Sequence, residues 1–211
     1  MTAWWGDDGL LTAPVAEAMR RGASQDAWEL EQALGLIALL APRTLVEIGC
    51  DRGGALYAWR SVAEVVIGIT LADNSYETGG SGLALDPPPG SRLIVGDSHA
   101  PATRALLLDA LVCAENPTVA HAVDVLVIDG DHTEAGVLAD LVMYGALVRP
   151  DGLILLHDIT STNDPRAEVH KLWPHLAPRF ETAEIRNPDG GFGWGVIHVR
   201  DGDRFEEADG G

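Results

Sequence analysis

Residues 123–132 read VDVLVIDGDH, and residues 149–158 read RPDGLILLHD. The apolar runs inside these segments are short and partly β-branched, as in strands that are buried on both faces of a parallel sheet. Between them, apolar residues recur at helical spacing over 137–148, and we expect Pro150 and Gly152 to end that helix. A strand, a helix and a second strand in this order form a right-handed βαβ unit, so the two strands are predicted to be parallel.

Both predicted strands end in polar residues, namely Asp129 after the first and His157-Asp158 after the second. Parallel strands end at the same edge of a sheet, and α/β folds bind their ligands at that edge. Neighbouring strands lie about 4.8 Å apart, so Asp129 and Asp158 could reach one bound atom if these strands are neighbours. Two carboxylates indicate Mg²⁺ or Ca²⁺. His157 as a further ligand would shift the preference toward Mn²⁺, Fe²⁺ or Zn²⁺, and the alternative is a packing or supporting histidine.

Two more polar residues follow Asp129 in the turn before the predicted helix. We interpret Asp131 as a cap of that helix, although it could also be a ligand. His132 would lie at the start of the helix, where the dipole favours the neutral imidazole that suits a general base. The alternative for His132 is a polar loop residue. His99, after another predicted strand, is interpreted as a loop residue rather than a catalyst.

The composition restricts the class of protein. The chain has 211 residues, 46% of them hydrophobic, which is enough for one well-buried α/β domain. Its net charge of −18 repels phosphate backbones, so we expect no nucleic-acid partner. Cys50 and Cys113 show no metal or redox spacing, no leader pattern is visible, and no apolar run approaches the ~18 residues of a membrane span. We therefore expect a cytoplasmic protein without membrane contact.

A glycine-rich turn follows an earlier predicted strand. Residues 44–48 form the strand, the turn at 49–54 reads GCDRGG, and a helix is expected over 55–62. Such a turn lets a backbone approach a ligand closely, and the helix N-terminus offers free N–H groups. The spacing differs from the dinucleotide fingerprint G-x-G-x-x-G. Glu47 is more informative, because a carboxylate at the end of a buried strand is costly unless it is paired or functional.

The remaining pattern completes one domain. We expect an N-terminal segment over 1–24, a main domain over 25–200, and a frayed acidic tail over 201–211. Ser24 is predicted to cap a helix over 25–40. Further elements are expected as a helix over 14–21, strands over 65–71 and 92–95, a helix over 102–113, a helix over 169–176, and a hairpin of strands over 180–185 and 192–199.

The ordered set of motifs resembles class I S-adenosylmethionine-dependent methyltransferases, in particular the cephalosporin hydroxylase-like and macrocin O-methyltransferase-like group. The resemblance covers about residues 25–200. It rests on LVEIG with the following glycine pair, and on the motifs VIGI (66–69), GDS (96–98), VIDGDH (127–132), LLHD (155–158) and GFGWGV (191–196). It implies a Rossmann-like doubly wound sheet of about seven strands, mostly parallel, with an antiparallel last strand.

The same resemblance implies S-adenosyl-L-methionine as the methyl donor. Glu47, Gly49 and the Gly53-Gly54 turn would hold its methionine part. Thr70 or Asp73 would lie near its ribose, and Asp97 with Ser98 near its adenine. The full set of expected donor contacts is Glu47, Gly49, Asp51, Gly53, Gly54, Thr70, Asp73, Asp97, Ser98 and Asp129.

In metal-dependent relatives, acids in these positions bind Mg²⁺. Asp129 and Asp158 match two of them, and His157 stands in the third place, where many relatives have an acid. His132 falls where those relatives place a base. The resemblance therefore implies metal-assisted O-methylation of a hydroxylated small molecule such as a sugar, a polyketide or another natural product, and leaves a homo-oligomer open. Two alternatives remain, namely a metal-dependent α/β hydrolase and a non-catalytic nucleoside-binding module.

Overall fold

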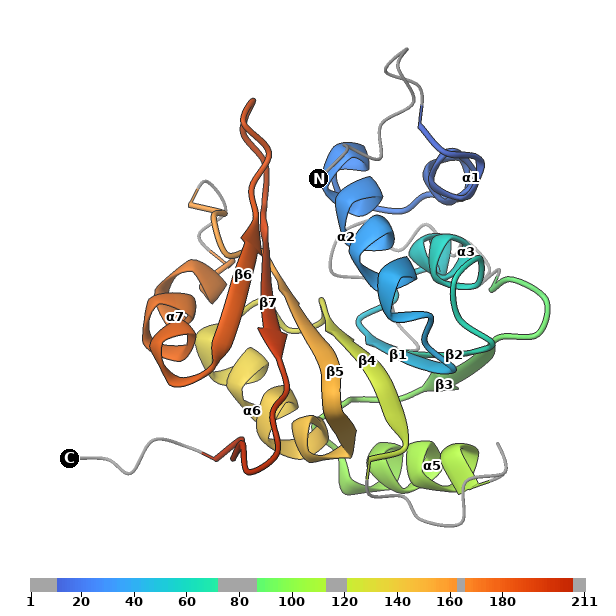
Figure 1. The fold of residues 1–211 in the computed structure, drawn as a ribbon. Coiled ribbons are helices and arrows are strands. Elements are labelled where there is room, and N and C mark those ends of the chain that lie inside the picture. The colour runs from blue at the N-terminus through green and yellow to red at the C-terminus, as the bar shows by residue number, and fades with distance from the viewer. Residues whose placement is uncertain (1–10, 72–86, 113–120, 163–165, 207–211) are drawn as a thin grey trace.

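The computed structural model describes residues 11–71, 87–112, 121–162 and 166–206. Seven strands form one sheet in the order β3-β2-β1-β4-β5-β7-β6 (Figure 1). β7 is antiparallel to both of its neighbours, and the other paired strands are parallel. The predicted α/β fold with one antiparallel last strand is therefore confirmed. The strands are β1 (Thr44–Ile48), β2 (Val65–Thr70), β3 (Arg92–Val95), β4 (Val123–Ile128), β5 (Val148–His157), β6 (Glu181–Ile185) and β7 (Trp194–His198).

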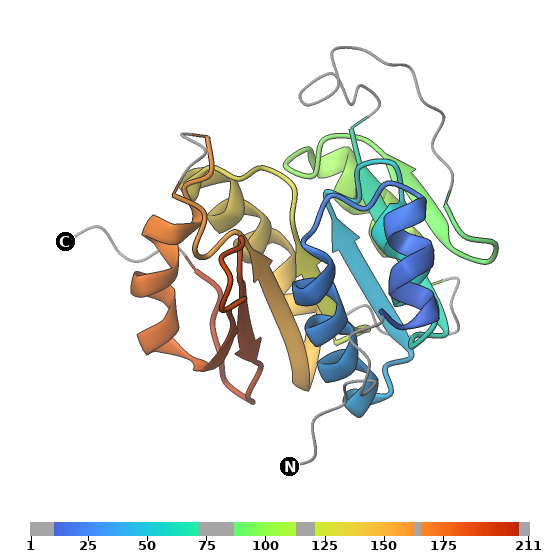
Figure 2. The same cartoon turned by 90° about the horizontal axis from the view of Figure 1, so that it is seen from above.

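Helices cover both faces of this sheet (Figures 1 and 2). One face packs against α1 (Ala13–Arg20), α2 (Ala27–Leu40) and α3 (Gly54–Trp59). The other packs against α5, α6 and α7. These three helices span Pro101–Val112, Glu134–Tyr144 and Val169–Leu176, and the short 3₁₀ turns η1 (Gly145–Leu147) and η2 (Ala177–Arg179) follow α6 and α7. The central strands are apolar on both faces because both faces are covered.

Three predicted helix boundaries are wrong, one of them the end of α3 at Trp59 rather than at residue 62. The residue that caps α2 is Asp26 rather than Ser24, and its side chain accepts a hydrogen bond from the Glu29 backbone N–H at 3.0 Å. The helix that was expected to reach residue 148 ends at Tyr144. Pro150 and Gly152 lie inside β5, in extra residues between the pairs Val123–Val148 and Val125–Leu153. Such a bulge tolerates a proline that a regular ladder position would exclude.

The segment that was expected to be a frayed tail is partly packed. Phe205 is buried, and its ring stacks on Phe180 with centroids 5.2 Å apart. Arg200 contacts carboxylates of both Asp151 and Glu181. Residues 201–206 are therefore anchored, whereas 207–211 lie outside the described residues. Within the described ranges, no helix is both long and apolar enough to cross a membrane.

The packing of α7 on β7 depends on a glycine, which gives a test of the fold. A Cβ at Gly195 would lie 2.6 Å from two ring carbons of Trp173, so Gly195→Ala should lower the free energy of unfolding by about 1–3 kcal/mol. Gly35→Ala is the matched control, because nothing described lies within 4 Å of a Cβ there, and alanine favours the α2 helix by up to about 1 kcal/mol. Urea unfolding measures both, and equal stability of the two variants would refute the packing.

Candidate active site

The ends of β1, β4 and β5 meet at one edge of the sheet, as predicted. β4 lies between the other two strands, with Ile128 beside Ile48 on one side and Leu156 on the other. The backbone N–H of Asp129 donates to the Ile48 carbonyl at 2.8 Å. The glycine turn after β1 and the acidic residues after β4 and β5 are therefore adjacent.

The glycine turn is shaped by this close approach. Gly49 has φ +86°, and a Cβ there would lie 2.1 Å from the Asp129 carbonyl oxygen. Gly53, with φ +88°, precedes α3 and donates its N–H to the Cys50 carbonyl at 2.7 Å. Only glycine fits Gly49 without moving the backbone of the neighbouring strand end. Gly49 and Gly53 thus present bare backbone at the edge where a ligand of an α/β fold binds.

Glu47 carries a buried carboxyl group beside this turn. Its Oε1 accepts a hydrogen bond from Trp59 Nε1 at 2.9 Å, and its Oε2 has no hydrogen-bond partner among the described residues. Burial raises the pKa of Glu47 to about 8, against a smaller opposing effect of the Trp59 hydrogen bond. An unsatisfied buried oxygen of this kind suits a ligand that brings a positive charge or a donor.

Asp129, His132 and Asp158 form the acidic cluster of the site. One ligand atom from each lies within 4.8 Å of the others, a spacing that could hold a metal ion. Asp158, whose φ is +67°, bonds to His132 Nδ1 through Oδ2. The three-residue set differs from the predicted set of Asp129, His157 and Asp158, in that His132 takes the place of His157.

His157 is buried instead between carboxylates and aromatic rings. Its Nδ1 donates to Asp129 Oδ1 at 2.9 Å, and Trp194 packs on its ring with centroids 4.3 Å apart. Burial alone would lower the pKa of His157, but the charge and hydrogen bond of Asp129 outweigh it and raise that pKa to about 10. The pKa of Asp129 is lowered, because the attraction of His157 outweighs the effect of burial. His157 is thus a cationic partner of Asp129 in this arrangement.

His132 does not lie at the helix N-terminus that was expected to favour its neutral form. His132 precedes the helix cap, which is Thr133. Burial lowers the pKa of His132, but the hydrogen bond to Asp158 and the charge of Asp129 outweigh it, so that pKa is raised. The predicted capping role of Asp131 is wrong. The side chain of Thr133 caps α6 by accepting a hydrogen bond from the Gly136 N–H, and Asp131 accepts one from the Thr133 N–H at 2.9 Å.

The residues that were expected near the ribose and adenine of the donor follow β2 and β3. Thr70 donates its hydroxyl to the carbonyl of Asp51 at 3.2 Å, and Asp73 lies outside the described residues. Ser98 is held through its carbonyl, which accepts from Tyr144 Oη at 2.5 Å. Asp97 accepts from the His99 N–H at 2.9 Å. Thr70, at the end of β2, thus contacts the glycine turn, and Asp97 and Ser98 follow the neighbouring parallel strand β3.

His99 belongs to a different cluster from His132. Its Nε2 lies 3.2 Å from the Gly136 carbonyl and 3.4 Å from Asp140 Oδ1. Asp140 is fully buried on α6, and burial raises its pKa to about 6. His99 is therefore a loop residue that contacts α6.

Sequence reasoning missed two polar residues at the N-terminal end of α2. Gln25 Nε2 donates to Asp129 Oδ2 at 2.5 Å, and the fully buried Glu29 lies 3.8 Å from His157 Nε2. A signal was present, because Glu29 lies four residues before Ala33 and eight before Ile37, on the apolar stripe of the helix. An acid on that stripe is buried, and a buried acid needs a partner or a function.

Comparisons with known proteins find solved structures of the same fold. The O-methyltransferase TomG from Streptomyces achromogenes, solved with SAM, is 18% identical at TM-score 0.54, with coverage of 88% of this chain and 87% of TomG. An O-methyltransferase from Bacillus cereus, solved with SAH, is 16% identical at TM-score 0.53, with coverage of 88% and 90%. The MycE methyltransferase from the mycinamycin pathway, solved with Mg, SAH and mycinamycin VI, is 17% identical at TM-score 0.59 over 95% of this chain and 56% of MycE.

At such identities these structures show a shared fold. No match was found among curated proteins. Residues 46–159, which include the glycine turn, Asp129, His132 and Asp158, match the family described as "Methyltransferase domain". This match covers more than half of the chain, and the chain therefore belongs to that family of methyltransferase domains.

Proposed function

We propose that the protein transfers a methyl group from S-adenosyl-L-methionine to the hydroxyl of a small molecule. The observation that carries this proposal is the contact between the two halves of the site. The glycine turn with Glu47 meets Asp129 directly, and Asp129 stands beside the His132–Asp158 pair. A donor site and a proton-accepting site are thereby adjacent, as a direct transfer of methyl to oxygen requires.

The turn after β1 fits the donor by the chemistry of its groups. The donor carries an ammonium group and would supply an electrophilic methyl. Glu47 Oε2 is a buried oxygen in need of such a positive partner, and Gly49 and Gly53 leave the backbone bare beside it. Glu47 would hold the amino-acid end, and Thr70, Asp97 and Ser98 follow along the same edge toward the nucleoside end.

His132 is the proposed general base. Its Nδ1 bonds to Asp158, which fixes the ring and leaves Nε2 for the proton of the acceptor hydroxyl. About a third of the His132 side chain is exposed, whereas the Asp158 side chain is buried, as expected for a base oriented by an inner acid. A raised pKa means that the base is competent above that raised value and is lost as the pH falls through it.

Asp129 and Asp158 would hold a divalent cation, which would supply Lewis acidity toward the acceptor oxygen. The donor set fits, since the two carboxylates suit Mg²⁺ or Mn²⁺, while His132 keeps its Nε2 for the proton of the acceptor. Binding of Mg by MycE, and of mycinamycin VI as its small-molecule ligand, supports this by likeness alone. His157 would support the cation by holding Asp129 rather than by ligating it.

Donor binding should depend on pH through Glu47. With a pKa raised from 4.5 to about 8, Glu47 is protonated below pH 8 and must lose its proton to pair with an ammonium group. Affinity for S-adenosylhomocysteine should therefore rise between pH 6 and 8, by at most about tenfold per unit, with release of a proton. Calorimetry in buffers of different ionisation heat measures both.

Glu47→Gln should bind S-adenosylhomocysteine more weakly and without this pH dependence. Glu64→Gln is the control, because Glu64 is an exposed acid away from the turn. If the unmodified protein does not bind S-adenosylhomocysteine at any pH, the methyl-donor proposal is refuted. If Glu47→Gln keeps the pH dependence, Glu47 does not bind the donor.

His132→Gln should lower methyl transfer by about 100-fold or more while S-adenosylhomocysteine still binds, because a base acts on the reaction and not on the donor. Transfer of labelled methyl to a panel of sugars, polyketides and phenols measures the rate. His175→Gln is the control, since His175 is exposed in the last turn of α7. Equal rates in both variants would show that another group takes the proton.

Asp129→Asn should abolish the binding of Mn²⁺ and any dependence of methyl transfer on metal, because an amide is a far weaker ligand than a carboxylate. Electron paramagnetic resonance of free Mn²⁺ measures the binding. Asp131→Asn is the matched control, because Asp131 is an acid two residues away that bonds to the Thr133 N–H. Retention of Mn²⁺ affinity in Asp129→Asn would place the cation elsewhere.

A further inference from the structure

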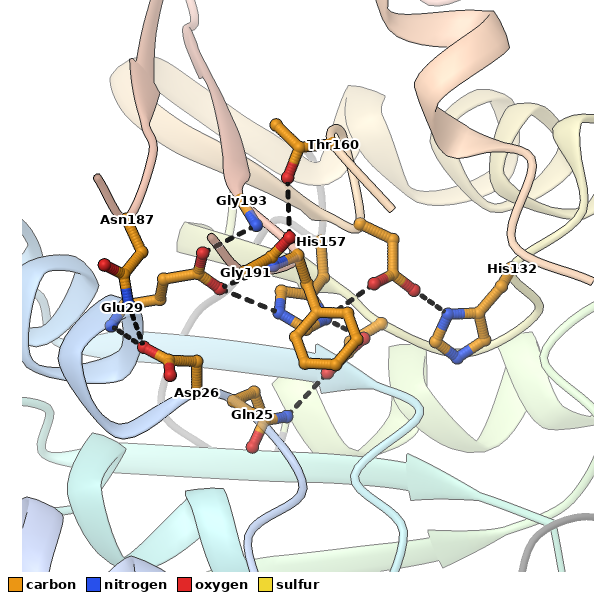
Figure 3. Close-up of polar contacts among 12 residues, drawn as sticks. Gln25, Asp26, Glu29, His132, His157, Thr160, Asn187, Gly191 and Gly193 are labelled. Carbon is orange, nitrogen blue, oxygen red and sulfur yellow. Dashed lines mark hydrogen bonds and ion pairs between the residues drawn. The ribbon is translucent and has the colours of Figure 1, made fainter. Parts of the chain in front are cut away.

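Glu29 is a fully buried acid of α2 to which the proposed mechanism gives no role. Its Oε1 accepts a hydrogen bond from the Gly193 N–H at 2.9 Å, and its Oε2 accepts from the Phe192 N–H at 3.3 Å. Figure 3 shows its carboxylate between this turn and the His157 ring, where Oε2 lies 3.8 Å from Nε2. One carboxylate thus contacts both the β6–β7 hairpin and His157.

The hairpin is shaped to receive this carboxylate. A Cβ at Gly191 would lie 2.2 Å from Glu29 Oε1, so a side chain larger than hydrogen would displace the carboxylate. The Gly191 carbonyl accepts a hydrogen bond from the Thr160 hydroxyl at 3.0 Å, which ties the turn to the loop after β5. The Glu29 carboxylate is therefore packed closely against the hairpin turn.

His157 passes this restraint on to Asp129. Its two ring nitrogens face carboxylates on opposite sides, with Nδ1 2.9 Å from Asp129 Oδ1 and Nε2 near Glu29. The ring also packs between Trp194 and Phe192, with centroids 4.3 and 5.6 Å away. The hydrogen bond at Nδ1, the ion-pair contact of Nε2 with Glu29 and the two aromatic rings restrain His157, and through it the Asp129 carboxylate.

The same end of α2 makes two more contacts around the site. Gln25 Nε2 donates to the other oxygen of Asp129 at 2.5 Å, and the capping Asp26 accepts from Asn187 Nδ2 at 3.1 Å. α2 lies beside the β6–β7 hairpin in Figure 2. Residues 25–29 therefore connect the hairpin, His157 and both oxygens of Asp129.

We propose that Glu29 is a positioning residue that, through His157, orients the Asp129 carboxylate toward the candidate cation. This inference rests on the cation site of the proposed function. It differs from a purely structural role, in which Glu29 would only tie the hairpin to α2. It also differs from a general effect of negative charge, in which the place of the carboxylate would not matter.

Two variants separate position from charge. Glu29→Gln removes the charge that faces His157 but keeps an oxygen for the Gly193 N–H. Gly191→Ala keeps the charge and pushes the carboxylate away, without backbone strain, since Gly191 does not have a positive φ. Glu31→Gln is the matched control on the same helix, because Glu31 bonds to Thr12 and away from the site.

The measurement is the affinity of the full chain for Mn²⁺ alone, by electron paramagnetic resonance, with S-adenosylhomocysteine affinity and thermal unfolding taken on the same samples. We expect Glu29→Gln and Gly191→Ala each to weaken Mn²⁺ binding at least about tenfold, with donor affinity within about twofold, and Glu31→Gln to match the unmodified protein. If Glu29→Gln does not fold, Gly191→Ala decides alone.

Each other outcome overturns the inference. If Glu29→Gln weakens Mn²⁺ binding but Gly191→Ala does not, only the charge of Glu29 matters. If neither variant changes the Mn²⁺ affinity, Glu29 only links the hairpin to α2. Equal losses of Mn²⁺ and donor binding would indicate a general loss of structure. An unmodified protein that binds the donor but no Mn²⁺ would refute this inference and leave the donor site standing, whereas failure to bind the donor would refute the proposed function itself.

Discussion

The buried pair of His157 and Asp129 is the interaction on which the rest of the site depends. Both side chains are almost completely excluded from water at the centre of the sheet edge. Removal of one member of such a pair typically costs about 3–5 kcal/mol, because the other charge remains buried without a partner. Asp129 keeps its charge in this position because the charge and hydrogen bond of His157, helped by His132 and by the Gln25 hydrogen bond, outweigh the effect of burial on its pKa.

Glu47 avoids the cost of a buried charge in the opposite way, by keeping its proton. It lies one strand away from Asp129 and is also buried, yet among the described residues Trp59 alone donates to it. Burial therefore raises its pKa to about 8, and the proton stays on below that pH. One acid of the site is thus held ionised by a resident cation, and the other is held neutral until a positive partner arrives. The difference follows from the neighbours, since both are carboxyl groups at the ends of adjacent parallel strands.

Much of this arrangement could be predicted from the sequence, because it depends on local patterns. The glycine turn, the apolar runs of β1 and β4, and the acids that follow them are contiguous in the chain, and parallel pairing alone brings their ends together. The predictions that were wrong are those in which a neighbouring residue, or a bulge, takes the role that was assigned from the sequence. Asp26 and Thr133 cap the two helices for which Ser24 and Asp131 were predicted as caps. Pro150, which was expected to end a helix, lies in a bulge of β5.

The contacts that sequence reasoning missed join residues more than a hundred positions apart. Gln25 meets Asp129, and Glu29 meets the turn before β7, through the placement of α2 against a hairpin that forms from the end of the chain. No local pattern specifies that placement, since it depends on β7 inserting between β5 and β6. The antiparallel strand therefore has a consequence beyond topology. It directs the Phe192 and Gly193 N–H groups back toward α2, where a buried acid can receive them and face His157 at the same time.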